Sequence, residues 1–188
     1  MNVSKGVAVV AVGGNSLIRD EKRKSIPDQA EAAAISMHHI VDMIRQGWEV
    51  VITHGNGLQV GYILRRSELA RTELHEVPLD YCGADTQGAI GYMFQQALYN
   101  EFLRRNMDKQ TVSVITRTVV DRQDPAFTHP TKPIGSFMSE AEAKTRAEED
   151  GWTVRTPVEA GAGLSHRRTP CALSKPGRSR HLCRPGLS

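Results

Sequence analysis

The sequence predicts an α/β fold, a three-layer α/β/α sandwich around a mainly parallel sheet. Two observations carry this prediction. First, the apolar, β-branched runs Val7–Val12 and Glu49–Thr53 are typical of strands buried on both faces, as in parallel sheets. Second, segments with helical spacing of apolar residues alternate with these runs along the chain. At 188 residues, the chain suits one domain, or one domain with an appendage.

Each of the first two predicted strands ends in a glycine loop. The loops are Gly13-Gly14-Asn15-Ser16 and His54-Gly55-Asn56-Gly57. Ligands of open α/β sheets bind at the carboxyl ends of the strands, and glycine lets backbone N–H groups approach a ligand closely. Neither loop fits the Walker or the GxGxxG pattern. The pair predicts an anion or phosphoryl site, although Asn15 and Asn56 also suit turns that tolerate a positive φ.

The helices follow from periodicity and from their boundary residues. Pro27 and Asp28 open a predicted helix over residues 28–46, which Gly47 ends. A second helix is predicted from Gln59 to Arg71 and a third over residues 84–105. Gly88 and Gly91 in the third helix indicate close packing of another element, and Cys82 is expected to be a small buried hydrophobe.

The remaining elements are a strand, a long loop, a helix and a strand. Thr111–Val120 is a third β-branched run and predicts a strand. The loop that follows, about residues 121–137, contains three prolines and no period, and a loop of this length is usually functional or disordered. Ser139 then caps a predicted helix over residues 140–149, and Trp152–Val154 begins another strand.

Composition excludes several classes of protein. The chain is 39% hydrophobic, which suffices for a core, but no stretch is apolar for long enough to span a membrane. The beginning of the sequence lacks the layout of a signal peptide. The three cysteines, Cys82, Cys171 and Cys183, have no metal-ligand spacing, so a reduced, cytoplasmic protein without a metal site is expected.

The net charge of +3 is concentrated at one end. Residues 156–188 contain six Lys or Arg and one acidic residue, Glu159, a net of +5, so that residues 1–155 carry −2. A basic tail can bind nucleic acid, but this one has no periodicity and four of the nine prolines. We therefore expect residues 1–155 to form the folded lobe, residues 156–188 to be disordered, and nucleic acid not to be a partner.

Four segments together resemble carbamate kinase, a branch of the amino-acid kinase superfamily. They match in order and at sensible spacing, and they are Val9–Ser16, Thr53–Gly57, Pro78–Tyr92 and Asp124–Gly135. The resemblance covers residues 5–155 and corresponds to about the first half of such an enzyme. The chain departs from the family at Leu58, where proline is usual, and at Asp85, where many relatives carry an uncharged residue.

The resemblance implies an amino-acid kinase-like fold and a magnesium-dependent reaction, carbamoyl phosphate and ADP giving ATP and carbamate, as in arginine metabolism. It implies that Gly13, Gly14 and Asn15 donate N–H groups to the transferring phosphoryl group. Gly55, Asn56 and Gly57 would bind the carbamoyl end. The catalytic residues would be Asn15 and Lys132. Lys132 lies on a loop stiffened by Pro130 and Pro133 and would neutralise charge on the substrate. A cytoplasmic homodimer is implied as well, with most of the ATP/ADP site in the half that has no counterpart here.

The sequence beyond residue 154 indicates a frameshift. Where the family continues Glu-Asp-Ala-Gly-Arg-Gly-Trp, this chain reads Arg155-Thr-Pro-Val-Glu-Ala-Gly. A single set of codons encodes both strings in two reading frames, at fourteen consecutive positions. We therefore expect a truncated, inactive form of the enzyme. The alternatives are a non-catalytic fragment that dimerises or binds a partner, and another amino-acid kinase, acting on acetylglutamate or a nucleoside monophosphate.

Overall fold

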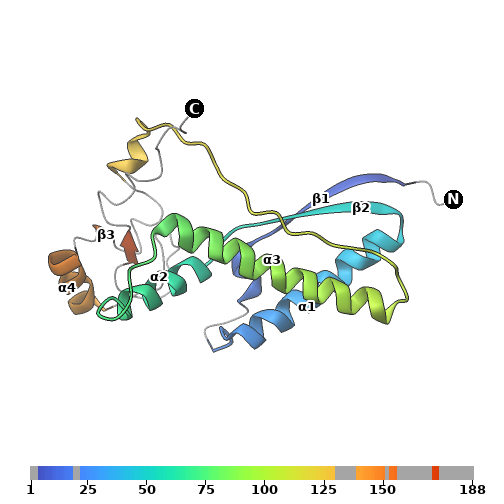
Figure 1. The fold of residues 1–188 in the computed structure, drawn as a ribbon, viewed down its shortest axis with the longest axis horizontal. Coiled ribbons are helices and arrows are strands. Elements are labelled where there is room, and N and C mark those ends of the chain that lie inside the picture. The colour runs from blue at the N-terminus through green and yellow to red at the C-terminus, as the bar shows by residue number, and fades with distance from the viewer. Residues whose placement is uncertain (1–3, 19–21, 130–138, 151–152, 156–170, 174–188) are drawn as a thin grey trace. The chain divides into compact units, whose positions relative to one another are not determined.

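The computed structural model describes residues 4–18, 22–129, 139–150, 153–155 and 171–173 (Figure 1). The chain forms two compact units. Unit 1 comprises Met1–Gly57 and Ala84–Thr116, and unit 2 comprises Leu58–Gly83 and Arg117–Ser188. The sequence predicted another division, into a folded lobe of residues 1–155 and a tail of residues 156–188. That division stays a prediction.

Unit 1 is built around a parallel pair of strands, β1 (Gly6–Val12) and β2 (Trp48–His54). The register pairs Val9 with Val51 and Val12 with His54. A short 3₁₀ turn, Gly14–Leu17, and helix α1 (Ile26–Arg45) connect the two strands. This β–α–β connection confirms the predicted α/β class and its parallel sheet.

The helices of unit 1 begin and end near the predicted residues. Helix α1 begins at a capping box in which the Ser25 side chain accepts from the Asp28 N–H and the Asp28 carboxylate accepts from the Ser25 N–H. Gly47, at φ 96°, follows its C-cap. Helix α3 spans Leu79–Arg104 and begins five residues earlier than predicted, because the Pro78 carbonyl already accepts from the Cys82 N–H at 3.0 Å.

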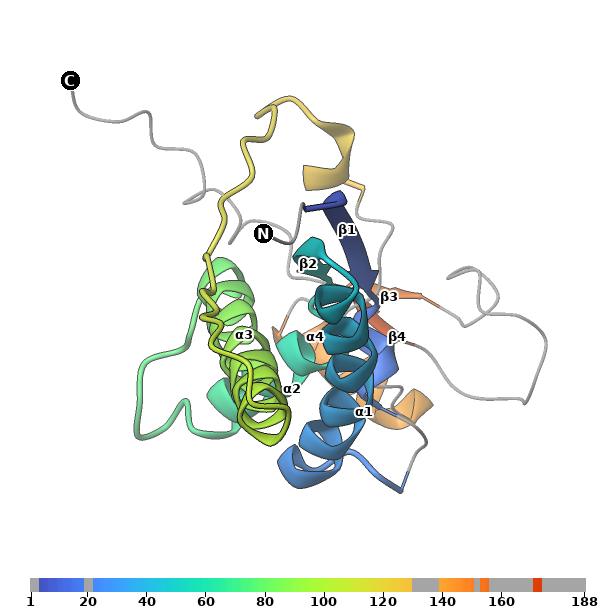
Figure 2. The ribbon, with the colours of Figure 1, turned by 90° about the vertical axis from the view of Figure 1, so that its right-hand side faces the viewer.

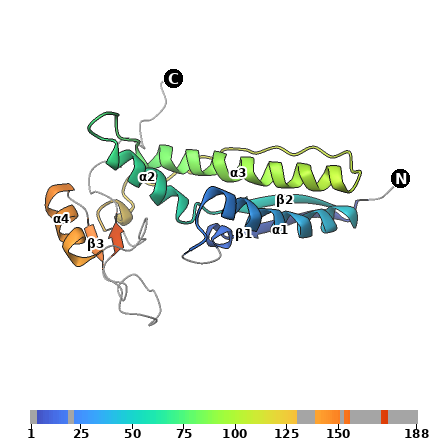
Figure 3. The ribbon, with the colours of Figure 1, turned by 90° about the horizontal axis from the view of Figure 1, so that it is seen from below.

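The core of unit 1 lies between the sheet and the helices α1 and α3. Figures 2 and 3 show α1 and α3 beside each other and along the strands. Core residues come from both helices and from Leu17 of the 3₁₀ turn, with the even-numbered side chains of the strands packed against them: Met37, Ile40, Val41, Ile90, Phe94, Leu98 and Phe102, against Val10, Val12, Val50 and Ile52. Both helices therefore bury one face of the β1–β2 pair.

The odd-numbered strand residues have a different environment. In the described part of unit 1, Val7, Val9 and Val51 are 65%, 69% and 48% exposed. Burial consequently alternates along both strands, whereas the sequence predicted strands buried on both faces. The reason is that the helices of this unit share one face of the sheet.

The predicted strand Thr111–Val120 is not a strand in the structure. Its first part, residues 111–116, runs without strand pairing along α3, and Val112 and Val114 are 82% and 72% exposed. The prediction of a third strand was therefore wrong. The physical reason is that backbone groups of Thr111 and Thr116 bond to side chains of α3 instead of to the edge of β2.

Unit 2 contains helix α2 (Gln59–Leu69), the first residues of α3, a 3₁₀ turn (Pro125–Phe127) and helix α4 (Glu140–Asp150). Two short strands, β3 (Thr153–Arg155) and β4 (Cys171–Leu173), pair antiparallel. Cys82 is buried, as predicted, and its Sγ lies 3.7 Å from the Val77 carbonyl oxygen. No helix in the described ranges is long and apolar enough to cross a membrane.

Candidate functional site

The sheet register places the two glycine loops at one edge of unit 1. Val12 and His54 are paired and are the last residues of β1 and β2, so Gly13 and Gly55 each begin a loop one residue beyond the same level. This is the carboxyl edge of a parallel pair, where ligands of open α/β sheets bind. The structure therefore brings together Gly13, Gly14 and Asn15 with Gly55, Asn56 and Gly57, as the sequence predicted.

The first loop is a tight turn anchored in the core. The Gly13 carbonyl accepts from the Ser16 N–H at 2.9 Å and from the Ser16 hydroxyl at 2.6 Å. Leu17, the last residue of this turn, is fully buried. A Cβ built on Gly13 meets nothing within 4 Å, so the space beside this residue is open in the free chain. The loop therefore combines a fixed backbone with an open side.

The second loop contains a residue in the left-handed region. Gly57 has φ 55°, a conformation that side-chain-bearing residues adopt only with strain. His54, just before the loop, packs its ring edge-to-face on Phe94 of α3, with ring centroids 5.7 Å apart. Its Nδ1 lies 3.2 Å from the Gly55 carbonyl oxygen. Phe94 is buried, so this aromatic contact holds the beginning of the loop against the core.

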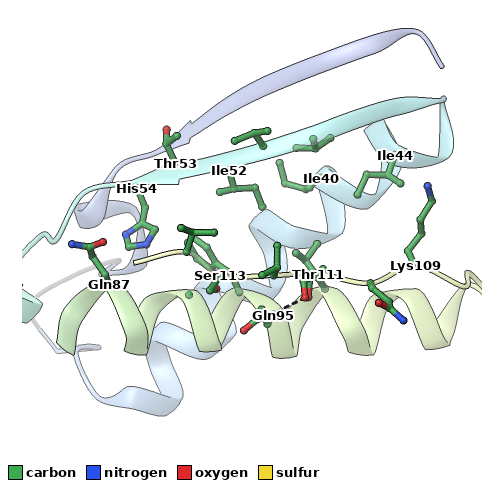
Figure 4. A pocket seen from close by; sticks show the side chains of 18 of the residues that line it. Ile40, Ile44, Ile52, Thr53, His54, Gln87, Gln95, Lys109, Thr111 and Ser113 are labelled. Carbon is green, nitrogen blue, oxygen red and sulfur yellow. Dashed lines mark hydrogen bonds between the residues drawn. The ribbon is translucent and has the colours of Figure 1, made fainter. Parts of the chain in front are cut away.

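A cavity of about 790 Å³ adjoins the second loop, between β2, α3 and the extended segment 109–116 (Figure 4). Its floor is apolar, formed by side chains that include Ile40, Ile52, Phe94 and Leu98. The end beside the glycine loop is polar, and it is lined by His54, Gly55, Asn56, Gln87 and Thr116. Polar and charged side chains also line the rest of the cavity, among them Glu49, Gln95 and Lys109.

Sequence reasoning missed the polar residues that α3 contributes to this cavity. Gln87 bonds to both backbone groups of Thr116, and the Gln95 amide donates to the Thr111 carbonyl at 3.1 Å. A signal was present in the sequence, because two glutamines eight residues apart flank Gly91 on the same face of a helix. The predicted close packing is confirmed at Gly91, which lies tightly against Ser113, whereas Gly88 is in ordinary contact range of Ile115.

The structure tests neither of the two predicted catalytic residues. Lys132 lies outside the described residues, and nothing is described of the Asn15 side chain, although its backbone belongs to the turn after β1. Of the two departures from the family, Asp85 is exposed on α3, and Leu58 is the N-cap of α2 without a side-chain hydrogen bond to it. The roles of Lys132 and Asn15 stay predictions.

A cluster of charged side chains joins α1 to the last turn of α3. Arg105 donates from Nε to Glu101 at 2.6 Å and from a terminal nitrogen to Asp42 at 2.5 Å. His38 Nδ1 lies 2.9 Å from Glu101, and Arg104 also pairs with Glu101. The hydrogen bond from Arg105 holds the pKa of Asp42 below its usual value.

Glu101 is the buried member of this cluster. Burial alone would raise the pKa of Glu101, but the hydrogen bonds from Arg105 and His38 outweigh it and leave the pKa lowered. In turn, the hydrogen bond to Asp42 raises the pKa of Arg105. The cluster links α1 to the last turn of α3 by charge-assisted hydrogen bonds.

The chain is similar to carbamate kinases over most of its length. It is 45% identical to the carbamate kinase of Pyrococcus horikoshii over 158 residues, 82% of this chain and 49% of that protein. It is 49% identical to the carbamate kinase-like protein YahI of Escherichia coli over 140 residues, 73% of this chain and 44% of that protein. None of the protein-family models compared with the chain matches it.

Solved structures agree with the sequence comparison. Carbamate kinase from Giardia lamblia bound to citric acid has a TM-score of 0.75 at 40% identity, and the match covers 82% of this chain and 50% of that one. The same enzyme bound to AMP-PNP has a TM-score of 0.73 at 36% identity, covering 93% and 53%. The chain thus spans about half the length of the relatives that it matches.

Proposed function

We propose that this chain, a homologue of the amino-terminal portion of carbamate kinases, carries the carbamoyl phosphate side of a carbamate kinase-type site. The reaction is transfer of a phosphoryl group between carbamoyl phosphate and ADP, giving carbamate and ATP. The observation that supports it best is the pairing of Val12 with His54, because this pairing puts both glycine loops at one sheet edge.

The proposed roles follow from what phosphoryl transfer requires. The protein does little covalent chemistry in such reactions and acts by positioning and by stabilising charge. Gly13, Gly14 and Asn15 would present backbone N–H groups to the phosphoryl oxygens, and the open side of Gly13 leaves room for a ligand. Gly55, Asn56 and Gly57 would bind the carbamoyl end beside the polar end of the cavity.

The remaining charge and the nucleotide require further groups. Lys132 is the residue that we propose to neutralise the transferring phosphoryl group. The nucleotide-bound relative from Giardia lamblia supports ATP or ADP as the second substrate. Among the described residues, no group of three or more His, Cys, Asp or Glu side chains could hold a metal ion.

The proposal is tested first by ligand binding, which does not require the complete reaction. Carbamoyl phosphate added to the ¹⁵N-labelled chain should shift the backbone amide signals of residues 13–15 and 55–57. Acetylglutamate and uridine monophosphate, the substrates of the alternative kinases, serve as comparison ligands. Each is added separately and should leave these signals unchanged. The proposal would be contradicted if carbamoyl phosphate caused no shift. It would also be contradicted if acetylglutamate or uridine monophosphate shifted these signals.

Turnover, assembly and location are tested separately. ATP formation from carbamoyl phosphate and ADP, measured with luciferase, reports whether the chain catalyses the reaction by itself. The expected homodimer is tested by light scattering, and a chain that stays monomeric at high concentration would contradict it. The cytoplasmic location implied by the resemblance is tested by fractionation of cells that produce the protein.

A further inference from the structure

One face of α3 carries three residues at intervals of four, and each meets the extended segment 111–116. Gln95 donates from its side-chain amide to the Thr111 carbonyl at 3.1 Å. Gly91 lies against Ser113, and Gln87 bonds to Thr116. An interval of four residues keeps all three on one helix face. This face of α3, defined by Gln87, Gly91 and Gln95, is called the glutamine track below.

The side chain of Gln87 bonds to both the N–H and the carbonyl of Thr116. Its Oε1 accepts from the Thr116 N–H at 2.8 Å and from the Thr116 hydroxyl at 3.2 Å, while its Nε2 donates to the Thr116 carbonyl at 3.2 Å. A primary amide carries both N–H donors and an acceptor oxygen, so it can pair with the N–H and with the carbonyl of a peptide unit. The side chain therefore satisfies the two backbone groups that a neighbouring strand would otherwise satisfy.

Gly91 allows the segment to approach the helix. A Cβ built on Gly91 lies 2.5 Å from the Ser113 Oγ and 3.0 Å from its Cβ, so any larger residue displaces the segment. Gly88, one turn earlier, differs in this respect, because a Cβ there lies 3.9 Å from the Ile115 Cδ1, an ordinary contact. The close fit is thus specific to the middle residue of the glutamine track.

We infer that Gln87 is a positioning residue, which fixes Thr116 and with it the wall of the cavity beside the second glycine loop. Gln87, Thr116, His54 and Asn56 line the same end of the cavity, and Figure 4 shows Gln87 close to His54 there. We expect this wall to contact the carbamoyl end of carbamoyl phosphate, and this expectation rests on the proposed function. The positioning itself is measurable without a ligand.

The first test compares Gln87→Leu with Gln96→Leu in the full chain. Gln96 is the matched control, because it lies on the same helix, is exposed and bonds only to the Tyr92 hydroxyl among the contacts that the structure gives it, at 2.9 Å. In Gln87→Leu, the Thr116 amide should exchange its hydrogen about tenfold faster or more, because it loses its acceptor. The backbone amide signals of His54–Gly57 should shift in the same variant.

The result that overturns the inference is equal behaviour of the two variants. If Gln87→Leu and Gln96→Leu have the same Thr116 exchange rate, Gln87 does not fix the segment. If the Thr116 amide exchanges faster in Gln87→Leu but the signals of residues 54–57 stay unchanged, Gln87 fixes the segment without positioning the loop. The inference is then wrong. Gln87→Glu keeps the acceptor and loses the donor, so an intermediate exchange rate is expected.

A second comparison uses the two glycines. Gly91→Ala and Gly88→Ala gain the same helix propensity, so a difference between them reports on the segment alone. Gly91→Ala should accelerate exchange of the amides in residues 111–116, while Gly88→Ala should not. Equal exchange in the two variants would show that the segment does not rest on the glutamine track.

Ligand binding separates this inference from the proposed function. If the wild-type chain binds carbamoyl phosphate, Gln87→Leu should weaken that binding severalfold while Gln96→Leu leaves it unchanged, and equal affinities would contradict the inference. If the wild-type chain does not bind carbamoyl phosphate, the proposed function fails. The ligand-free exchange and chemical-shift measurements then decide on Gln87 by themselves.

Discussion

Val12 lies opposite His54 in the parallel register of β1 and β2, and each is the last residue of its strand. The two glycine loops begin at the same level because the strands end at the same level. A slip of one residue would place one loop a residue further along and turn its side chains to the other face of the sheet. The packing of Val10, Val12, Val50 and Ile52 on one core fixes this register.

The glycines of the two loops should differ in what they contribute. Gly57→Ala forces a side chain into φ 55° and should lower the free energy of unfolding by about 1 kcal/mol, since the left-handed region costs L-residues roughly 1–2 kcal/mol. Urea unfolding followed by circular dichroism measures this change. A free energy within error of the wild type would show that the loop adopts another conformation in solution.

Gly13→Ala is the matched comparison for ligand approach. A Cβ at Gly13 meets nothing within 4 Å, so the free energy of unfolding should stay close to that of the wild type. Binding of carbamoyl phosphate should nevertheless weaken by tenfold or more, about 1.4 kcal/mol in free energy, because the methyl group occupies the space of the ligand. Unchanged affinity in a folded Gly13→Ala chain would remove this loop from the proposed site.

The sequence was sufficient for the features that depend on local signals. Gly47 and the run of apolar residues before it define α1, and each glycine loop is visible at the end of its own strand. The resemblance to carbamate kinases rested on the two glycine-loop segments and on Pro78–Tyr92 and Asp124–Gly135, and the comparisons bear it out.

The extended segment shows what local signals leave open. The residues of 111–116 suit any extended chain, and their pattern does not specify a partner. The partner of the segment is α3, because Gln87 and Gln95 bond to Thr116 and Thr111. These glutamines are more than fifteen residues away in sequence from the threonines that they bond. In the same way, the alternating burial of Val9 and Val51 depends on which face α1 and α3 cover, and a β-branched run does not encode this.

Met37 is a direct measure of how much the core of unit 1 contributes. Its side chain is fully buried between α1, α3 and the sheet. Met37→Ala should lower the free energy of unfolding by about 2–5 kcal/mol, the range for emptying a buried site of this size. Ile35→Ala on the same helix is the control, because Ile35 is 46% exposed, and it should cost clearly less. Equal losses in urea unfolding would contradict the described core.

The capping box at the start of α1 predicts a difference between two serines. Ser25→Ala removes the side chain that accepts from the Asp28 N–H and should cost about 1 kcal/mol of stability. Ser36 lies within the same helix, and its hydroxyl donates to the Ala32 carbonyl at 3.3 Å, so Ser36→Ala should be neutral or slightly stabilising. Thermal unfolding of the two variants distinguishes these effects, and a larger loss in Ser36→Ala would contradict the assignment of the cap.

The charged cluster between α1 and α3 predicts how stability depends on pH. Glu101 and Asp42 have usual pKa values of 4.5 and 3.8, and both are lowered in the folded chain. As the pH falls below these values, the unfolded chain takes up protons before the folded chain does, which favours unfolding. The stabilisation from the cluster is therefore present in full above the usual values and is lost as the pH falls through the lowered ones.

Glu101→Gln tests the contribution of one of these carboxyl groups. The amide that replaces the carboxyl group does not titrate, so the free energy of unfolding should fall less steeply between about pH 5 and pH 3 than in the wild type. At pH 7 the variant should be the less stable of the two, because Arg105 and His38 lose a charged acceptor. Parallel pH profiles for wild type and Glu101→Gln would show that Glu101 has its usual pKa in the folded chain.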